Sequence, residues 1–150
     1  MAVGQLSLKG RALRLLSTRE HSRAELERKL GPHEEEPGQL RRILDELQAK
    51  DFINEQRVVE SLLHRRAPRL GAARIRLELQ GKGLDAQMVA QALDRLRATE
   101  LQRAREVWRK KFAVPPQDAR ERGKQARYLA ARGFGGDVIR RVLGGAEDLG

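Results

Sequence analysis

The sequence contains no cysteine and few aromatic residues, and both shortages narrow what the protein can be. Without cysteine there is no disulfide framework, no Cys-ligated zinc site and no thiol nucleophile. Aromatic residues make up 3% of the 150 residues, so a core must consist mostly of Leu, Ile, Val and Ala, which favours helices over sheets. The sequence also lacks an apolar run near the roughly 18 residues of a membrane span, and the apolar stretch of a signal peptide. We therefore expect a cytoplasmic protein without a membrane partner.

Groups that could carry catalysis or hold a metal are scarce as well. The three histidines, His21, His33 and His64, stand in different segments, and His33 has acidic neighbours but no second histidine at metal-ligand spacing. The run Gly81–Gly83 contains Gly-Lys-Gly but is not followed by the Ser or Thr of a phosphate-binding P-loop. We expect no catalytic residue, no cofactor and no metal site.

Basic residues are abundant and unevenly distributed. The chain has 31 Lys and Arg against 21 Asp and Glu, a net charge of +10. Residues 1–50 contain 10 basic and 8 acidic side chains, residues 51–100 contain 9 and 7, and residues 101–150 contain 12 and 6. The final third thus contributes +6 of the +10, and this excess indicates a polyanion or an acidic protein surface as partner.

One short motif occurs twice, at an offset of 50 residues. Aligning Leu79 with Leu129 pairs Lys82-Gly83 with Arg132-Gly133 and places apolar residues opposite apolar residues beyond them. At an offset of 49 the apolar positions of the first third align too, with the polar loop 31–38 in place of the basic-Gly turn. The sequence is therefore a threefold repeat.

Each repeat divides into three helical stretches with recognisable ends. Apolar residues recur at helical spacing, and Gly83 suits the left-handed position that follows a helix. The candidate N-terminal caps are the capping-box pairs Ser22/Glu25 and Thr99/Gln102 and the single residues Asn54 and Asp85. These signals predict an all-α fold, an elongated tandem array of three-helix repeats at residues 1–52, 53–98 and 99–150.

The stretch Arg74–Asp85, Arg-Ile-Arg-Leu-Glu-Leu-Gln-Gly-Lys-Gly-Leu-Asp, resembles the middle repeat of the RecX family of bacterial recombination regulators. Segments 22–26, 47–54, 128–134 and 137–139 support the resemblance, which extends from about Gly10 to Leu143. The acidic loop 31–38 is longer than the family pattern leads us to expect.

The resemblance implies a non-enzymatic regulator that binds the RecA filament on single-stranded DNA. Such a protein lies in the filament groove and damps strand exchange, ATP hydrolysis and the co-protease activity that triggers the SOS response. The implied fold, a chain of three-helix repeats, agrees with the one predicted from the repeats above.

The third repeat supplies most of the residues that we expect to contact RecA or DNA. These are Arg109, Lys110, Lys111, Arg120, Arg122, Lys124, Arg127, Arg132, Arg140 and Arg141, with Arg74, Arg76 and Lys82 of the middle repeat as secondary candidates. Lys and Arg can bind either carboxylates or phosphates, so the sequence leaves the type of partner group open.

Two rival functions are weaker. A helix-turn-helix DNA-binding protein would also have short helices, glycine turns and basic charge, but three similar units offer no distinct recognition helix. Single-strand binding by base stacking needs exposed aromatics, and all five except Tyr128 fit apolar helix faces or turns. We expect weak non-specific DNA binding at most, and a monomer, with a domain-swapped dimer as the alternative.

Overall fold

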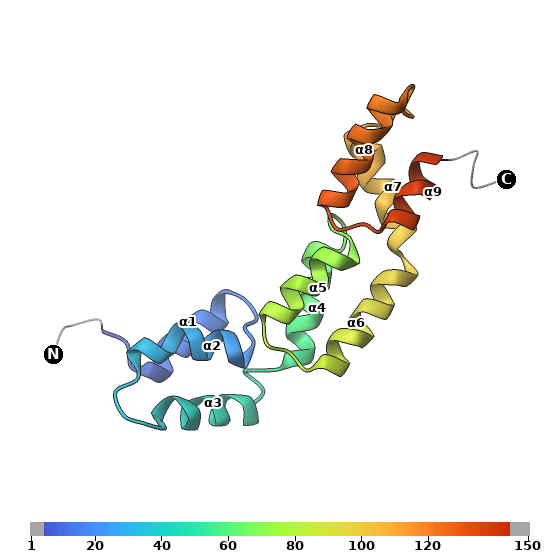
Figure 1. Cartoon of the computed structure of the whole chain (residues 1–150). Helices are drawn as coiled ribbons and strands as arrows, with labels where there is room; N and C mark the ends of the chain where they lie inside the picture. Colours follow the sequence, from blue (N-terminus) through green and yellow to red (C-terminus); the bar gives the residue numbers. More distant parts are fainter. Residues whose placement is uncertain (1–4, 145–150) are drawn as a thin grey trace.

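The helices are arranged as a bent row of three units rather than around one centre (Figure 1). The computed structural model describes residues 5–144, which form nine α-helices and one 3-10 turn. The elements are α1 (Leu8–Thr18), α2 (Arg23–Leu30), η1 (Gly31–His33), α3 (Gln39–Ala49), α4 (Glu55–Arg66), α5 (Ala72–Gly81), α6 (Ala86–Ala98), α7 (Glu100–Lys111), α8 (Ala119–Ala131) and α9 (Gly136–Gly144). The prediction of an all-α array of three three-helix units is confirmed.

The first unit contains α1–α3, the second α4–α6 and the third α7–α9 (Figure 1). The outer ends of the predicted first and third repeats, residues 1–4 and 145–150, lie outside the described residues. Within residues 5–144, no helix has the length and apolar character needed to cross a membrane.

Each unit has an apolar core of its own. Leu26 and Leu44 are fully buried in the first core, Ile75 and Leu79 in the second, and Leu129 in the third. Burying a side chain of this size stabilises a fold by about 2 kcal/mol. Because each unit buries its own apolar faces, the units form a row and leave long helix faces exposed.

Most of the predicted helix ends are confirmed. The Ser22 side chain accepts from the Glu25 amide at 3.1 Å, and the Glu25 carboxylate accepts from the Ser22 amide at 2.9 Å, which completes the capping box. Asn54 caps α4 and Asp85 caps α6 through their side-chain oxygens. Gly83 adopts φ +66°, a left-handed conformation that glycine reaches without a Cβ clash.

The predicted capping box at Thr99 is wrong. Thr99 alone separates α6 from α7, so the chain enters α7 directly from a preceding helix. Its hydroxyl donates to the Leu96 carbonyl at 3.3 Å and accepts from the Arg103 guanidinium at 3.0 Å. The hydroxyl therefore bonds to the C-terminal turn of α6, and no side-chain cap forms on α7.

The second helices of the three units, α2, α5 and α8, follow one another end to end along the inside of the bend (Figure 1). The C-terminal turn of α5 contacts the N-terminus of α2, and the C-terminal turn of α8 contacts the N-terminus of α5. The motif that the sequence repeats, a basic residue followed by glycine, forms both joints.

At the joint between the first and second units, the Ser22 hydroxyl donates to the Lys82 carbonyl at 2.7 Å. A Cβ at Gly83 would lie 2.7 Å from the Cβ of Ala24, closer than two such atoms pack. Gly83 thus has a second role beyond ending α5, because it allows the backbone to approach α2.

At the joint between the second and third units, backbone amides of the second unit donate hydrogen bonds to groups of the third. The amide of Gly71 donates to the Arg132 carbonyl at 2.8 Å, and the amide of Ala73 donates to the Gly133 carbonyl at 3.2 Å. The amide of Ala72 donates to the Glu100 carboxylate at 2.6 Å. Gly71 has no side chain to cap α5, so two carbonyls and one carboxylate of the third unit satisfy the first amides of this helix.

We predict that Gly71→Ala weakens this joint. The new Cβ would lie 2.3 Å from the Gly133 carbonyl oxygen, and backbone must move to relieve the clash. The free energy of unfolding, measured by urea titration with circular dichroism, should fall by about 1–3 kcal/mol.

Gly81→Ala is the matched control. A Cβ at Gly81 meets nothing within 4 Å, and alanine is the better helix former, so stability should rise by up to about 1 kcal/mol. Equal effects of the two substitutions would contradict the close approach at Gly71.

Candidate partner-binding surface

The cations predicted to bind a partner fall into two groups in the third unit. Four are engaged within the chain: Arg109 pairs with Glu106, Arg140 with Asp137, Arg122 donates to the Leu143 carbonyl, and Arg132 donates to the Tyr128 hydroxyl. The others are exposed and form no ion pair within the described part of the chain. They are Lys110, Lys111, Arg120, Lys124, Arg127 and Arg141.

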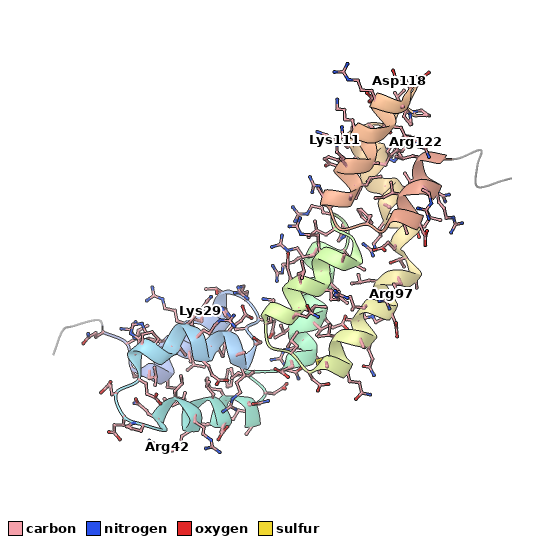
Figure 2. All side chains as sticks on the ribbon, in the orientation of Figure 1. Lys29, Arg42, Arg97, Lys111, Asp118 and Arg122 are labelled. Atoms are coloured by element: carbon pink, nitrogen blue, oxygen red, sulfur yellow. The ribbon has the colours of Figure 1, made fainter. Side chains whose placement is uncertain are left out.

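Five of these exposed residues come from two adjacent helices, and we call Lys110, Lys111, Arg120, Lys124 and Arg127 the α7–α8 cation set. Arg120, Lys124 and Arg127 are spaced four and three residues apart, so they share one face of α8 over about 10 Å. Lys110 and Lys111 end α7, and Lys111 lies on the inner side of the bend (Figure 2). The structure thus leaves five cations of two adjacent helices exposed and without an ion pair within residues 5–144.

A pocket of about 270 Å³ lies at the joint between the second and third units, and we call it the joint pocket. Its lining residues are Pro68, Arg69, Val107, Lys110, Lys111, Tyr128 and Arg132. The Tyr128 ring has the Arg132 guanidinium 4.9 Å and the Lys111 ammonium 5.3 Å from its centroid, and Phe112 packs against it edge to face. Sequence reasoning did not single out Arg69, because the fold alone places it beside the third unit.

The middle-unit candidates have different surroundings. Arg76 is exposed on α5, and Arg74 is exposed but donates to the Ala131 carbonyl of the third unit at 2.8 Å. Between them and the end of the helix, Leu77 has 61% of its surface exposed. Sequence reasoning missed Leu77, although it stands two residues from both inward-facing Ile75 and Leu79 and so lies off the apolar stripe.

Lys82, the third middle-unit candidate, forms an ion pair within the chain. Only 14% of its side chain is exposed, and its ammonium donates to the Glu25 carboxylate of the first unit at 3.2 Å. Burial alone would raise the pKa of Glu25, but hydrogen bonds from the Ser22 amide and from the Arg19 and Lys82 side chains outweigh it and lower this pKa from 4.5 to about 2. Lys82 therefore holds two units together, and we leave it out of the partner-binding surface.

Arg103 is a further cation whose role sequence reasoning missed. Its guanidinium donates to the carbonyls of Ala67, Leu70 and Leu96 at 2.6–2.9 Å, and 13% of the side chain is exposed. Desolvation lowers the pKa of Arg103, although the neighbouring Glu100 opposes this shift. Arg103 thus ties α7 to the end of α4, to the connection that follows it and to the end of α6.

Family models match this chain in three successive segments. They are described as the first, second and third three-helix domains of RecX, and they match residues 9–47, 54–93 and 98–143. The regulatory protein RecX of Leptothrix cholodnii is 58% identical over 93% of this chain and 88% of its own length. The protein of the same name from Ralstonia pickettii is 45% identical over 96% of this chain and 91% of its own length.

Two crystal structures share the fold. RecX from Lactobacillus salivarius superposes with a TM-score of 0.73 at 23% identity, covering 93% of this chain and 94% of its own. A second structure, described as regulatory protein RecX, has a TM-score of 0.72 at 20% identity, covering 90% of this chain and 70% of its own.

We predict that Glu25→Gln makes the protein less stable and its stability less dependent on acid. The pKa of Glu25 is depressed in the folded state, so its stabilisation is complete above about pH 4.5 and is lost as the pH falls toward 2. At pH 7 the substitution should lower the free energy of unfolding by about 3 kcal/mol, because it leaves the Lys82 ammonium buried without its counter-charge.

Urea titrations at several pH values between about 2 and 7 measure this effect, because that range includes both the ordinary and the lowered pKa of Glu25. Glu36→Gln, in the exposed loop before α3, is the control and should follow the wild-type curve. A Glu25→Gln curve as steep as wild type between about pH 4.5 and 2 would contradict the assignment.

Proposed function

Because this chain belongs to the RecX family of regulatory proteins, we propose that it binds RecA filaments on single-stranded DNA and inhibits the activities of RecA. The inhibited activities are strand exchange, ATP hydrolysis and co-protease function, and through them the chain regulates homologous recombination and the SOS response. It acts by binding, without catalysis of its own, in the cytoplasm and as a monomer.

This proposal rests on two observations together, the extended shape of the chain and the exposed positive charge of its third unit. The three units form a bent row whose inner side is bordered by α2, α5 and α8 (Figure 1). A row of repeats presents a long concave surface, which suits a filament groove better than a globule of the same size would. We propose residues 1–52, 53–98 and 99–150 as the units, and the three segments matched by the family models support this division.

Within this surface we propose the α7–α8 cation set as the main contact with RecA or with its DNA. These five side chains are exposed and are not neutralised by acids of residues 5–144, so their charge is available to a partner. Arg76 and the exposed Leu77 of α5 extend the contact to the middle unit. Arg is enriched at protein interfaces, and a partner that covers Leu77 would remove exposed apolar surface from water.

The first test reverses four charges of the set at once. We expect the variant Lys110→Glu, Lys111→Glu, Lys124→Glu, Arg127→Glu to require at least about tenfold more protein for half-inhibition of RecA-driven ATP hydrolysis. All four residues are exposed, so the fold should be retained, as circular dichroism can check. Unchanged inhibition would show that the contact lies elsewhere.

A matched pair of double variants separates position from net charge. Lys124→Glu/Arg127→Glu lies on α8, whereas Arg41→Glu/Arg42→Glu lies on α3 of the first unit, where Figure 2 shows Arg42 on the outer side of the bend. Both pairs remove the same amount of positive charge. Only the α8 pair should weaken inhibition, and equal weakening would indicate a general charge effect instead.

Binding to DNA alone distinguishes this function from a helix-turn-helix protein. We expect weak binding to single-stranded and duplex DNA that falls steeply with salt and does not depend on sequence, because cations contacting phosphates carry no base information. Fluorescence anisotropy with oligonucleotides of different sequence measures both properties. A preference of about a hundredfold or more for one DNA sequence over others is typical of sequence-specific proteins and would favour the helix-turn-helix alternative.

A further inference from the structure

The joint pocket collects positive charge from both sides of a boundary between units. Arg69 comes from the connection between α4 and α5 in the second unit, whereas Lys110, Lys111 and Arg132 come from the third. No acid is among the lining residues, and none of these four cations forms an ion pair within residues 5–144. Like charges that face one another across a joint repel, so these four cations oppose the contact between the units.

Tyr128 holds two of these cations in place. Its hydroxyl accepts from the Arg132 guanidinium at 2.8 Å, while Lys111 and Arg132 both lie near its ring. Because this bond uses the oxygen as acceptor, the hydroxyl proton remains available for donation to a ligand. The pocket therefore offers several ammonium and guanidinium donors and one neutral hydroxyl donor.

This donor set fits a phosphate better than a carboxylate. A carboxylate has two oxygens in one plane and is matched by a single arginine fork, whereas a phosphate can accept from donors that approach from several directions. The donors here come from α7, α8 and the α4–α5 connection. Pro68 and Val107 add an apolar wall, which suits the sugar that follows each phosphate in a nucleic-acid strand.

We propose that the joint pocket binds a backbone phosphate of single-stranded DNA and that the bound phosphate fixes the third unit against the second. The phosphate removes the repulsion among Arg69, Lys110, Lys111 and Arg132, so binding and docking of the units strengthen each other. The biological meaning of this site rests on the function proposed above, since a RecA filament presents such a strand.

Trp108 fluorescence can measure ligand binding, and hydrogen exchange of two backbone amides can measure how firmly the units are docked. Trp108 stands next to Val107 on α7, and its indole donates to Gln125 at 2.8 Å, so its fluorescence responds to changes beside the pocket. The amides of Gly71 and Ala73 bind carbonyls of the third unit, so their hydrogen exchange reports how firmly the units are docked.

The experiment uses the full chain without RecA. Oligothymidylate, pyrophosphate and an oligoglutamate peptide are titrated separately while Trp108 fluorescence is followed, and amide exchange is measured by NMR with and without each ligand. We expect oligothymidylate to bind and to slow exchange at Gly71 and Ala73, with pyrophosphate acting more weakly. The Glu25 amide, which donates to the Ser22 side chain within the first unit, is the control and should be unaffected.

The double variant Arg69→Ala/Tyr128→Phe should weaken oligothymidylate binding about tenfold, because it removes one charged and one neutral donor. Neither replacement enlarges the side chain, and Arg42→Ala on α3 of the first unit is the control that should bind as wild type. Wild-type affinity in the double variant would overturn the site.

Two other outcomes would also overturn the inference. Binding of oligoglutamate in preference to oligothymidylate would assign the pocket to an acidic protein segment. Oligothymidylate binding without slower exchange at Gly71 and Ala73 would remove the coupling to docking. Failure of the wild-type chain to bind RecA filaments would instead reject the proposed function and leave the result on DNA alone intact.

Discussion

The need to satisfy the first amides of α5 is the constraint on which the arrangement of the units depends. Helix starts leave backbone donors without partners in the helix, and a side-chain cap usually supplies an acceptor. Gly71 has no side chain, and carbonyls of Arg132 and Gly133 together with the Glu100 carboxylate serve instead. Docking of the third unit therefore completes the hydrogen bonds at the start of this helix. This dependence gives a row with separate cores a defined relative placement of its units.

The two joints share one geometry and differ in chemistry, and the difference decides where charge is available. Lys82 and Arg132 occupy equivalent places before a left-handed glycine. At the first joint, the first unit supplies a capping box of its own and a buried carboxylate, so Lys82 is drawn inward to Glu25. The second joint includes bonds from backbone to backbone, and Arg132 donates to Tyr128 in the joint pocket. One repeated motif thus yields a structural ion pair at one joint and a pocket-lining cation at the other.

The ends of the row of second helices do not repeat these joints. In the first unit α2 is followed by η1, which contains Pro32, instead of a basic-Gly turn. In the third unit Asp118 caps α8 with its own side chain, so the start of that helix needs no carbonyl from elsewhere. Repeat arrays generally have terminal units that differ from the inner ones, because a complementary pair of ends would allow chains to add to one another. Arg120, Lys124 and Arg127 follow this capped start on α8 and remain exposed, so a partner can reach them.

The sequence by itself determined the parts of this protein that depend on near neighbours in the chain. Helix starts at Ser22, Asn54 and Asp85 and the glycine turns were predictable, since capping and apolar spacing act over three or four residues. The cap predicted at Thr99 does not form, because α6 leads directly into α7. The cations near Tyr128 were predicted only in part, because Arg69 comes from a different unit. The partner of Lys82 lies 57 residues away in Glu25, and the acceptor for the Gly71 amide lies in Arg132. Only the tertiary structure decided which cations are buried and which are exposed, because that depends on contacts between units rather than on any local pattern.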